Sequence, residues 1–157
     1  MSQPIETLKS NLLELLTETF ETPRGIYLDR PKGGLFTTLE GMSAEAASSE
    51  SRTQRSIAAH VEHLRVYVAA LRGYMNGATD ETDWEASWAT NKVSSLEWNA
   101  LQAALKRDYE MLMTDLEQVP DGDLRLAESM AILAHSAYHF GAIRQLLLGI
   151  DLSQIAD

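Results

Sequence analysis

The four histidines of the chain are its most distinctive chemical feature, because they fall in two close pairs. His60 and His63 stand three residues apart, and His135 and His139 stand four residues apart. On an α-helix, positions four apart differ by about 40° around the axis and by about 6 Å along it. His135 and His139 therefore project side by side if their segment is helical, and two imidazoles placed in this way can bind one metal ion.

We expect His135 and His139 to point into the protein rather than at solvent. The same face of their helix carries apolar and aromatic residues, namely Leu124, Ala131, Tyr138, Ala142 and Leu146. A buried imidazole without a partner costs roughly 1 to 3 kcal/mol per unsatisfied group, and a shared metal ion removes that cost. A single buried histidine is more often a hydrogen-bonded core residue than a ligand, but two inward pairs favour a metal site.

Other catalytic patterns are missing from the sequence. No glutamate stands three residues before a histidine, as the Glu-x-x-His motif of di-iron bundles requires. The His-Glu-x-x-His motif of zinc proteases is also missing. The chain has no cysteine, which excludes disulfides, thiolate ligands and a cysteine nucleophile. Any thiol in the chemistry would therefore have to be a cosubstrate.

Four stretches of helical periodicity must position the histidines. They cover about residues 3–21, 53–76, 94–118 and 123–148, and no stretch shows a sustained two-residue alternation. Ser94 followed by Glu97 has the spacing of a capping box, which predicts a helix start at that point. The sequence therefore predicts an all-α protein, a four-helix bundle of the up-and-down kind with a long first connection.

Two long connections separate the predicted helices. Residues 22–52 are expected to contain one short helical turn near residues 35–39, and residues 78–93 carry Trp84 and Trp88 one helical turn apart. We expect the two tryptophans to cover one end of the core. The last helix is apolar on nearly all sides, and a helix without a polar face is expected to be the central one.

Length and charge limit the class of protein. A chain of 157 residues fits a single domain, residues 1–157. The net charge of −10 repels phosphates, which argues against binding to nucleic acid or to anionic membranes. The first residues lack the basic and apolar regions of a signal peptide, and no apolar run approaches the roughly 20 residues that span a bilayer. We therefore expect a cytoplasmic protein.

The segments around the two histidine pairs resemble the DinB/YfiT-like family of metalloenzymes. The residues that carry the resemblance are Ser56-Ile-Ala-Ala-His-Val-Glu-His63-Leu64 and His135-Ser-Ala-Tyr-His139-Phe-Gly141-Ala-Ile143. The order of the helices and the long first connection fit along nearly the whole chain. The family's fold is a four-helix bundle in which three histidines hold one divalent metal ion, usually zinc or nickel.

This resemblance implies which residues bind the metal. One family ligand on the second helix directly precedes an aliphatic residue, and two lie four apart on the last helix, which gives His63, His135 and His139. The helical wheel prefers His60, because the apolar arc of the second helix is centred near it and His63 lies towards the edge. His60 is therefore either the alternative ligand on this helix or a residue that contacts the ligands without binding the metal itself. Glu128, two turns before His135, is a candidate base, with a surface or capping role as the alternative.

Three neutral imidazoles leave a divalent ion an open coordination position, as in catalytic zinc sites. Characterised relatives include transferases that use low-molecular-weight thiols and an isomerase, and relatives are commonly dimers. The resemblance thus implies a homodimeric metal-dependent hydrolase or thiol transferase that acts on an unidentified small molecule. The alternative is a non-catalytic dimeric bundle, a binding or stress-related module, in which the metal or the histidines are structural. An open cavity that reaches the ion would separate the two.

Overall fold

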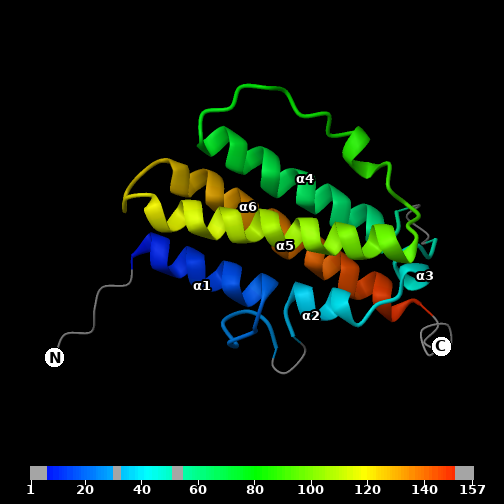
Figure 1. Ribbon diagram of the computed structural model, residues 1–157. Helices are drawn as coiled ribbons and strands as arrows, with labels where there is room; N and C mark the ends of the chain where they lie inside the picture. The colour runs from blue at the N-terminus through cyan, green and yellow to red at the C-terminus, as the bar shows by residue number, and fades with distance from the viewer. Residues whose placement is uncertain (1–6, 30–32, 51–54, 151–157) are drawn as a thin grey trace.

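The computed structural model describes residues 7–29, 33–50 and 55–150. Within these ranges all regular secondary structure is helical, so the all-α prediction is confirmed (Figure 1). The elements are α1 (Leu8–Phe20), α2 (Leu35–Glu40), α3 (Ala44–Ala47), α4 (Ile57–Met75), the short 3-10 helix η1 (Ala86–Trp88), α5 (Ser95–Gln118) and α6 (Arg125–Leu148). None of the described helices is both long enough and apolar enough to cross a membrane.

Side chains mark where three of the long helices begin. Thr7 caps α1 by accepting from the backbone N–H of Ser10, and Ser56 caps α4 in the same way. The predicted capping box at the start of α5 is confirmed, because Ser94 and Glu97 each accept from the other's backbone N–H. The predicted first turns of the first two helices, residues 3–6 and 53–54, lie outside the described residues.

The four long helices lie along one another, but they do not alternate in direction (Figure 1). Arg65 of α4 pairs with Asp108 of α5 at 3.4 Å, and about two turns further along both helices Arg72 pairs with Asp115 at 2.6 Å. From the first ion pair to the second, the residue number increases by seven in both helices, so α4 and α5 run in the same direction. The simple up-and-down order is therefore wrong for this pair, and the connection between them, residues 76–94, must return along the length of α4. We call it the crossover.

The central helix is α4 and not α6. No residue of α4 is exposed, because α5, α6 and η1 all pack against it. In contrast, α6 leaves large apolar side chains in solvent, namely Leu124 at its N-cap, Met130, Tyr138 and Leu148. The expectation that α6 would be central is therefore wrong. A sequence apolar on all sides can also belong to an outer helix with an apolar outward face.

The first connection folds onto α5. The short helix predicted near residues 35–39 is confirmed as α2, and the indole N–H of the buried Trp98 donates to the carbonyl of Met42 at 2.9 Å. Phe36 and Phe20 lie against the ring of Tyr109, with centroids 5.4 and 4.5 Å away. These contacts fix α1, α2 and α5 relative to one another.

A buried carboxylate fixes the start of the same connection. Glu18, at the end of α1, accepts hydrogen bonds from four successive backbone N–H groups, those of Gly25, Ile26, Tyr27 and Leu28, at 2.8 to 3.2 Å. Burial raises the pKa of Glu18, but the four backbone donors outweigh it and the pKa is lowered. The charged form of Glu18 therefore stabilises this loop.

Candidate metal centre

Three of the four histidines meet between α4 and α6. His63 comes from α4, and His135 and His139 come from adjacent turns of α6. One ring nitrogen of each lies within 4.8 Å of the other two, and the ring centroids are 4.4 to 5.2 Å apart. Because α4 and α6 pack against each other, residues far apart in the sequence lie side by side between them. The three predicted ligands are thus close enough to bind one metal ion.

The hydrogen bonds of His63 define which of its nitrogens is free. Its Nδ1 lies 2.6 Å from the Oγ of Ser87, whose hydroxyl donates to the carbonyl of Trp84 at 2.6 Å. Since that hydroxyl hydrogen is already used, the Ser87 oxygen accepts from the Nδ1–H of His63. The proton of the neutral ring therefore sits on Nδ1. The Nε2 of His63 keeps its lone pair, which is the form that binds a metal.

His60 contacts a predicted ligand and does not join the group of three. Its Nδ1 lies 2.9 Å from the Nδ1 of His139, so one of these nitrogens donates and the other accepts. When the Nδ1 of His139 is the donor in this contact, its Nε2 keeps the lone pair that binds a metal. Of the two histidines of α4, His63 is the one whose ring nitrogen lies close to those of both His135 and His139, and His60 lies behind His139.

His135 supplies a test of whether the site fits a metal. Its Nε2 is buried and has no hydrogen-bond partner among the residues that the structure describes. An unsatisfied buried nitrogen costs roughly 1 to 3 kcal/mol, so such atoms are rare without a reason. Here the nitrogen belongs to a group of three neutral imidazoles, which is a donor set that suits zinc and nickel. The residues present therefore fit a divalent transition metal.

The environment keeps the imidazoles neutral. Burial, together with the charge of neighbouring histidines, lowers the pKa of His135 to about 4 and that of His139 to about 3. Burial also lowers the pKa values of His60 and His63, and the positive charge of Arg55 lowers both further. At neutral pH each ring is thus unprotonated at one nitrogen, which metal binding requires.

Aromatic rings from the crossover and from α4 cover the histidines. Trp88 stacks on His63 with centroids 3.9 Å apart, and Tyr67 stacks on His135 at 3.6 Å. The ring centroid of Trp84 lies 6.4 Å from that of His63 and 5.6 Å from that of Tyr67. The crossover thus brings both tryptophans over the histidines, whereas the sequence predicts only that they cover an end of the core.

The crossover also explains why the helical wheel misplaced His63. On α4 alone, His63 lies towards the edge of the apolar arc and should be more open than His60. In the structure the side chain of His63 is only 7% exposed, whereas His60 is half-buried. Ser87 and Trp88 pack over the edge of the arc, and a wheel drawn for one helix does not include them.

The inward face of α6 also differs from the predicted one. Leu124 and Tyr138, expected inside, are 87% and 71% exposed, while Ser129 and Ser136 are fully buried. Each buried serine donates to a carbonyl of its own helix, at 2.9 and 2.7 Å, so that burial leaves its hydroxyl satisfied. His139 lies on this buried stripe and His135 at its edge.

The candidate base Glu128 lies away from the three histidines. It is exposed, and seven residues along a helix place it about 10 Å from His135. A general base acts across about 2.6 to 3.2 Å or through one water molecule. The contacts of the described residues do not connect Glu128 with the cluster, so its catalytic role stays a prediction.

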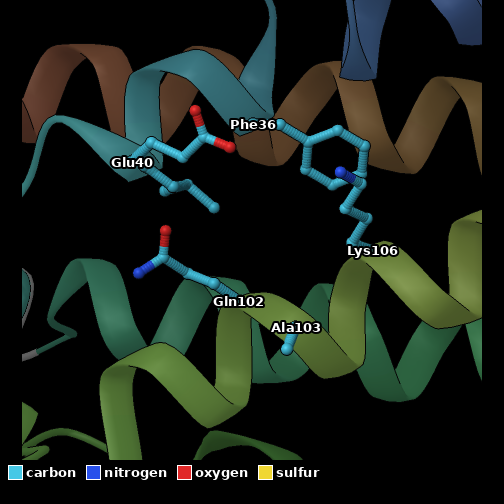
Figure 2. A pocket seen from close by; sticks show the side chains of 6 residues that line it. Phe36, Glu40, Gln102, Ala103 and Lys106 are labelled. Carbon is cyan, nitrogen blue, oxygen red and sulfur yellow. The ribbon is translucent and has the colours of Figure 1, made fainter. Parts of the chain in front are cut away.

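Part of the first connection lines a cavity on the surface of α5. Between α2 and α5 lies a cavity of about 160 Å³. Figure 2 shows its lining, with Phe36 and Glu40 on α2 facing Gln102, Ala103 and Lys106 on α5. No histidine contributes to it, so this cavity is separate from the candidate metal centre.

Ser87 is the site residue that sequence reasoning missed. It stands in a polar connection, in no periodic pattern, and its only signal is its position between Trp84 and Trp88. Comparisons of the chain with protein-family models, with curated proteins and with solved structures find no match. The positions of the ring nitrogens and of their partners therefore carry the assignment of the site.

Proposed function

We propose that the protein is a metalloenzyme that binds one divalent transition metal ion, zinc or nickel, through the Nε2 atoms of His63, His135 and His139. The observation that carries the proposal is the unpartnered, buried Nε2 of His135 beside two imidazoles whose Nδ1 atoms are already used. We also propose that the four long helices form a bundle of the DinB/YfiT-like kind, with the ligands on its second and fourth long helices.

Such an ion supplies a Lewis acid with at least one coordination position open to a small molecule. The chain's own residues prepare this position. Ser87 orients His63 and His60 orients His139, in each case by a contact with the Nδ1 atom of the ligand. Trp88 and Tyr67 cover the outer faces of His63 and His135 and keep water from them. This division of roles suits hydrolysis, or transfer of a thiol, on a small substrate.

The charge near the site favours an anionic substrate. The guanidinium of Arg55 lies 4.9 Å from the ring centre of Trp88, and its charge is strong enough at His60 and His63 to lower their pKa values. Arg55, which also pairs with Glu85 at 4.0 Å, is thus a cation near the site that can attract a thiolate or carboxylate in a protein whose net charge otherwise repels anions. Because the chain has no cysteine, a low-molecular-weight thiol is the cosubstrate of the transferase reaction.

The second candidate is a non-catalytic bundle in which the same ion is structural. The observation in its favour is the burial of the cluster, since His63 and His139 are 7% and 2% exposed and two aromatic rings stack on it. A closed cluster would hold a metal but admit no substrate. The two candidates share the ligands and differ in whether a small molecule can reach the ion.

Metal analysis and a thiol assay test the proposal. Protein purified without chelator should contain about one zinc or nickel ion per chain. Loss of free thiol in the presence of an electrophilic acceptor should require the metal and should stop in His139→Ala. Absence of metal, even after incubation with zinc or nickel, would contradict the proposed site. Full metal content without thiol transfer or hydrolysis would favour the structural candidate.

A further inference from the structure

Two neighbouring cavities lie between α2 and α5, and no histidine lines either of them. The smaller one, of about 160 Å³, is the cavity of Figure 2. The larger one, of about 390 Å³, lies further along α5 and shares Phe36 and Lys106 with the first. It is also lined by Glu21, the C-cap of α1, and by Tyr109 and Glu110 of α5. We call the two cavities together the α2 groove.

The larger cavity is lined by a residue with a buried polar group that has no partner. Tyr109 is 1% exposed, and its hydroxyl makes no hydrogen bond with any residue that the structure describes. Burial raises the pKa of Tyr109, and the nearby carboxylate of Glu21 raises it further, so the hydroxyl keeps its proton at neutral pH. Glu21 lines the same cavity, so the hydroxyl end of the ring lies on the cavity side. A buried, unsatisfied hydroxyl destabilises a protein, and a polar ligand would give it a partner.

Four charged side chains line the α2 groove, and none of them forms an ion pair within the described part of the chain. They are Glu21, Glu40, Lys106 and Glu110. One ammonium against three carboxylates gives the groove a net charge of −2. A ligand that complements these charges carries positive groups and one negative group.

Backbone contacts hold both ends of the groove in place. The N–H of Gly34 donates to the carbonyl of Glu21 at 3.2 Å, and a Cβ atom at residue 34 would lie 2.6 Å from that oxygen, so only glycine fits. Beyond the other end of α2, the carbonyl of Met42 accepts from the indole of Trp98 on α5. The groove therefore exists before any ligand arrives, as most small-molecule sites do.

The groups around the larger cavity suit the head of an amino acid. Glu21 and Glu110 can accept hydrogen bonds from an ammonium group, and the hydroxyl oxygen of Tyr109 can accept a third. Lys106 can bind the carboxylate beside that ammonium. A free α-amino acid presents these two groups on one carbon atom.

The smaller cavity suits a long side chain that ends in a cation. Phe36 and Leu39 provide apolar contact, and Figure 2 shows Glu40 and Gln102 at the end away from Lys106. Residues 102 and 106 are about 6 Å apart along the helix, a length that the four-carbon stem of lysine can span. We propose that the α2 groove binds a free basic amino acid, L-lysine or L-arginine, with its head at Tyr109 and its side-chain cation at Glu40.

Isothermal titration calorimetry of the full chain at about 0.15 M salt tests the proposal, because this salt screens the net charge of the protein. L-lysine has about ten non-hydrogen atoms and should bind with a dissociation constant of about 0.1 to 1 mM. Cadaverine lacks the carboxylate and L-norleucine lacks the side-chain ammonium, so each should bind at least about tenfold more weakly. No binding of L-lysine at about 10 mM, or equal affinity for the three compounds, would overturn the proposal.

Substitutions in the groove test where the amino acid binds. Glu110→Gln should weaken L-lysine binding about tenfold, whereas Glu117→Gln, at another exposed glutamate of α5, should match the wild type. Lys106→Gln should remove the preference for L-lysine over cadaverine. Tyr109→Phe should weaken binding and leave the free protein at least as stable, because the unpartnered hydroxyl is gone. Unchanged binding in both Glu110→Gln and Lys106→Gln would overturn the groove as the site.

One further variant separates this site from the candidate metal centre, because amino acids can also chelate a metal ion. No histidine lines the α2 groove, so His135→Ala should bind L-lysine like the wild type. Loss of binding in His135→Ala would place the amino acid on the metal and overturn the proposal. The inference uses no metal, so it stands or fails independently of the proposed function.

Discussion

The Nδ1 atom of His63 donates to the hydroxyl of Ser87 across 2.6 Å, and this contact ties α4 to the crossover that covers it. Ser87 in turn donates to the carbonyl of Trp84, so the proton position on His63 depends on a turn of backbone 24 residues away in sequence. A ligand histidine is oriented by what its second nitrogen binds. The crossover is therefore part of the candidate metal centre and not only a connection.

Removing the Ser87 hydroxyl should weaken metal binding without abolishing it. We expect Ser87→Ala to raise the dissociation constant of zinc about 10- to 100-fold, because His63 loses the partner that fixes its ring and tautomer. Competition with a chromophoric chelator measures this constant. Ser95→Ala, at an exposed serine at the start of α5, is the matched control and should leave it unchanged. Equal affinities in the two variants would show that Ser87 does not orient His63.

The four histidines should contribute unequally to metal binding. His63→Ala, His135→Ala and His139→Ala each remove a ligand and should reduce the metal content to near zero after dialysis. His60→Ala removes only the partner of the His139 Nδ1, so it should keep the metal with lower affinity. Elemental analysis of the four variants distinguishes these outcomes. The assignment is wrong if His60→Ala loses the metal and His63→Ala retains it.

The stability of the fold should depend on the charge of Glu18. Because backbone donors lower its pKa in the folded protein, its carboxylate stabilises the fold above the unfolded pKa of about 4.3. That stabilisation is lost as the pH falls through the lower folded pKa. Glu18→Gln should therefore reduce the free energy of unfolding at pH 7 by about 1 to 3 kcal/mol, and by less at pH 3.

Urea denaturation at several pH values measures this dependence. Glu14→Gln, at a half-exposed glutamate one turn earlier on α1, is the control and should change stability by less than about 1 kcal/mol. If Glu18→Gln lowers the free energy of unfolding equally at pH 7 and pH 3, the backbone N–H groups around Glu18 do not stabilise its charged form.

Local signals in the sequence predicted much of this structure. The capping box at Ser94 and Glu97 fixed a helix start, and it involves only neighbouring residues. The spacing of His135 and His139 placed two imidazoles side by side, because one helix determines both positions. Joining His63 to them needed the family resemblance, since it depends on how two distant helices pack.

The remaining features depend on contacts between distant parts of the chain. The parallel course of α4 and α5 makes the crossover return over His63, and no pattern within α4 indicates that cover. The outward face of α6 could not be identified either. Its apolar residues lie on all sides, and the buried stripe is marked by serines, which a hydrophobic pattern reads as polar.

Cobalt substitution tests the central claim most directly, because it reports both the ligands and their openness. With three imidazoles and an open position, the cobalt protein should have a visible spectrum of the four-coordinate type that changes on addition of a low-molecular-weight thiol and with pH near neutrality. His135→Ala should lose this spectrum. A wild-type spectrum that ignores thiols, small anions and pH would contradict a catalytic site and leave the histidine cluster with a structural role.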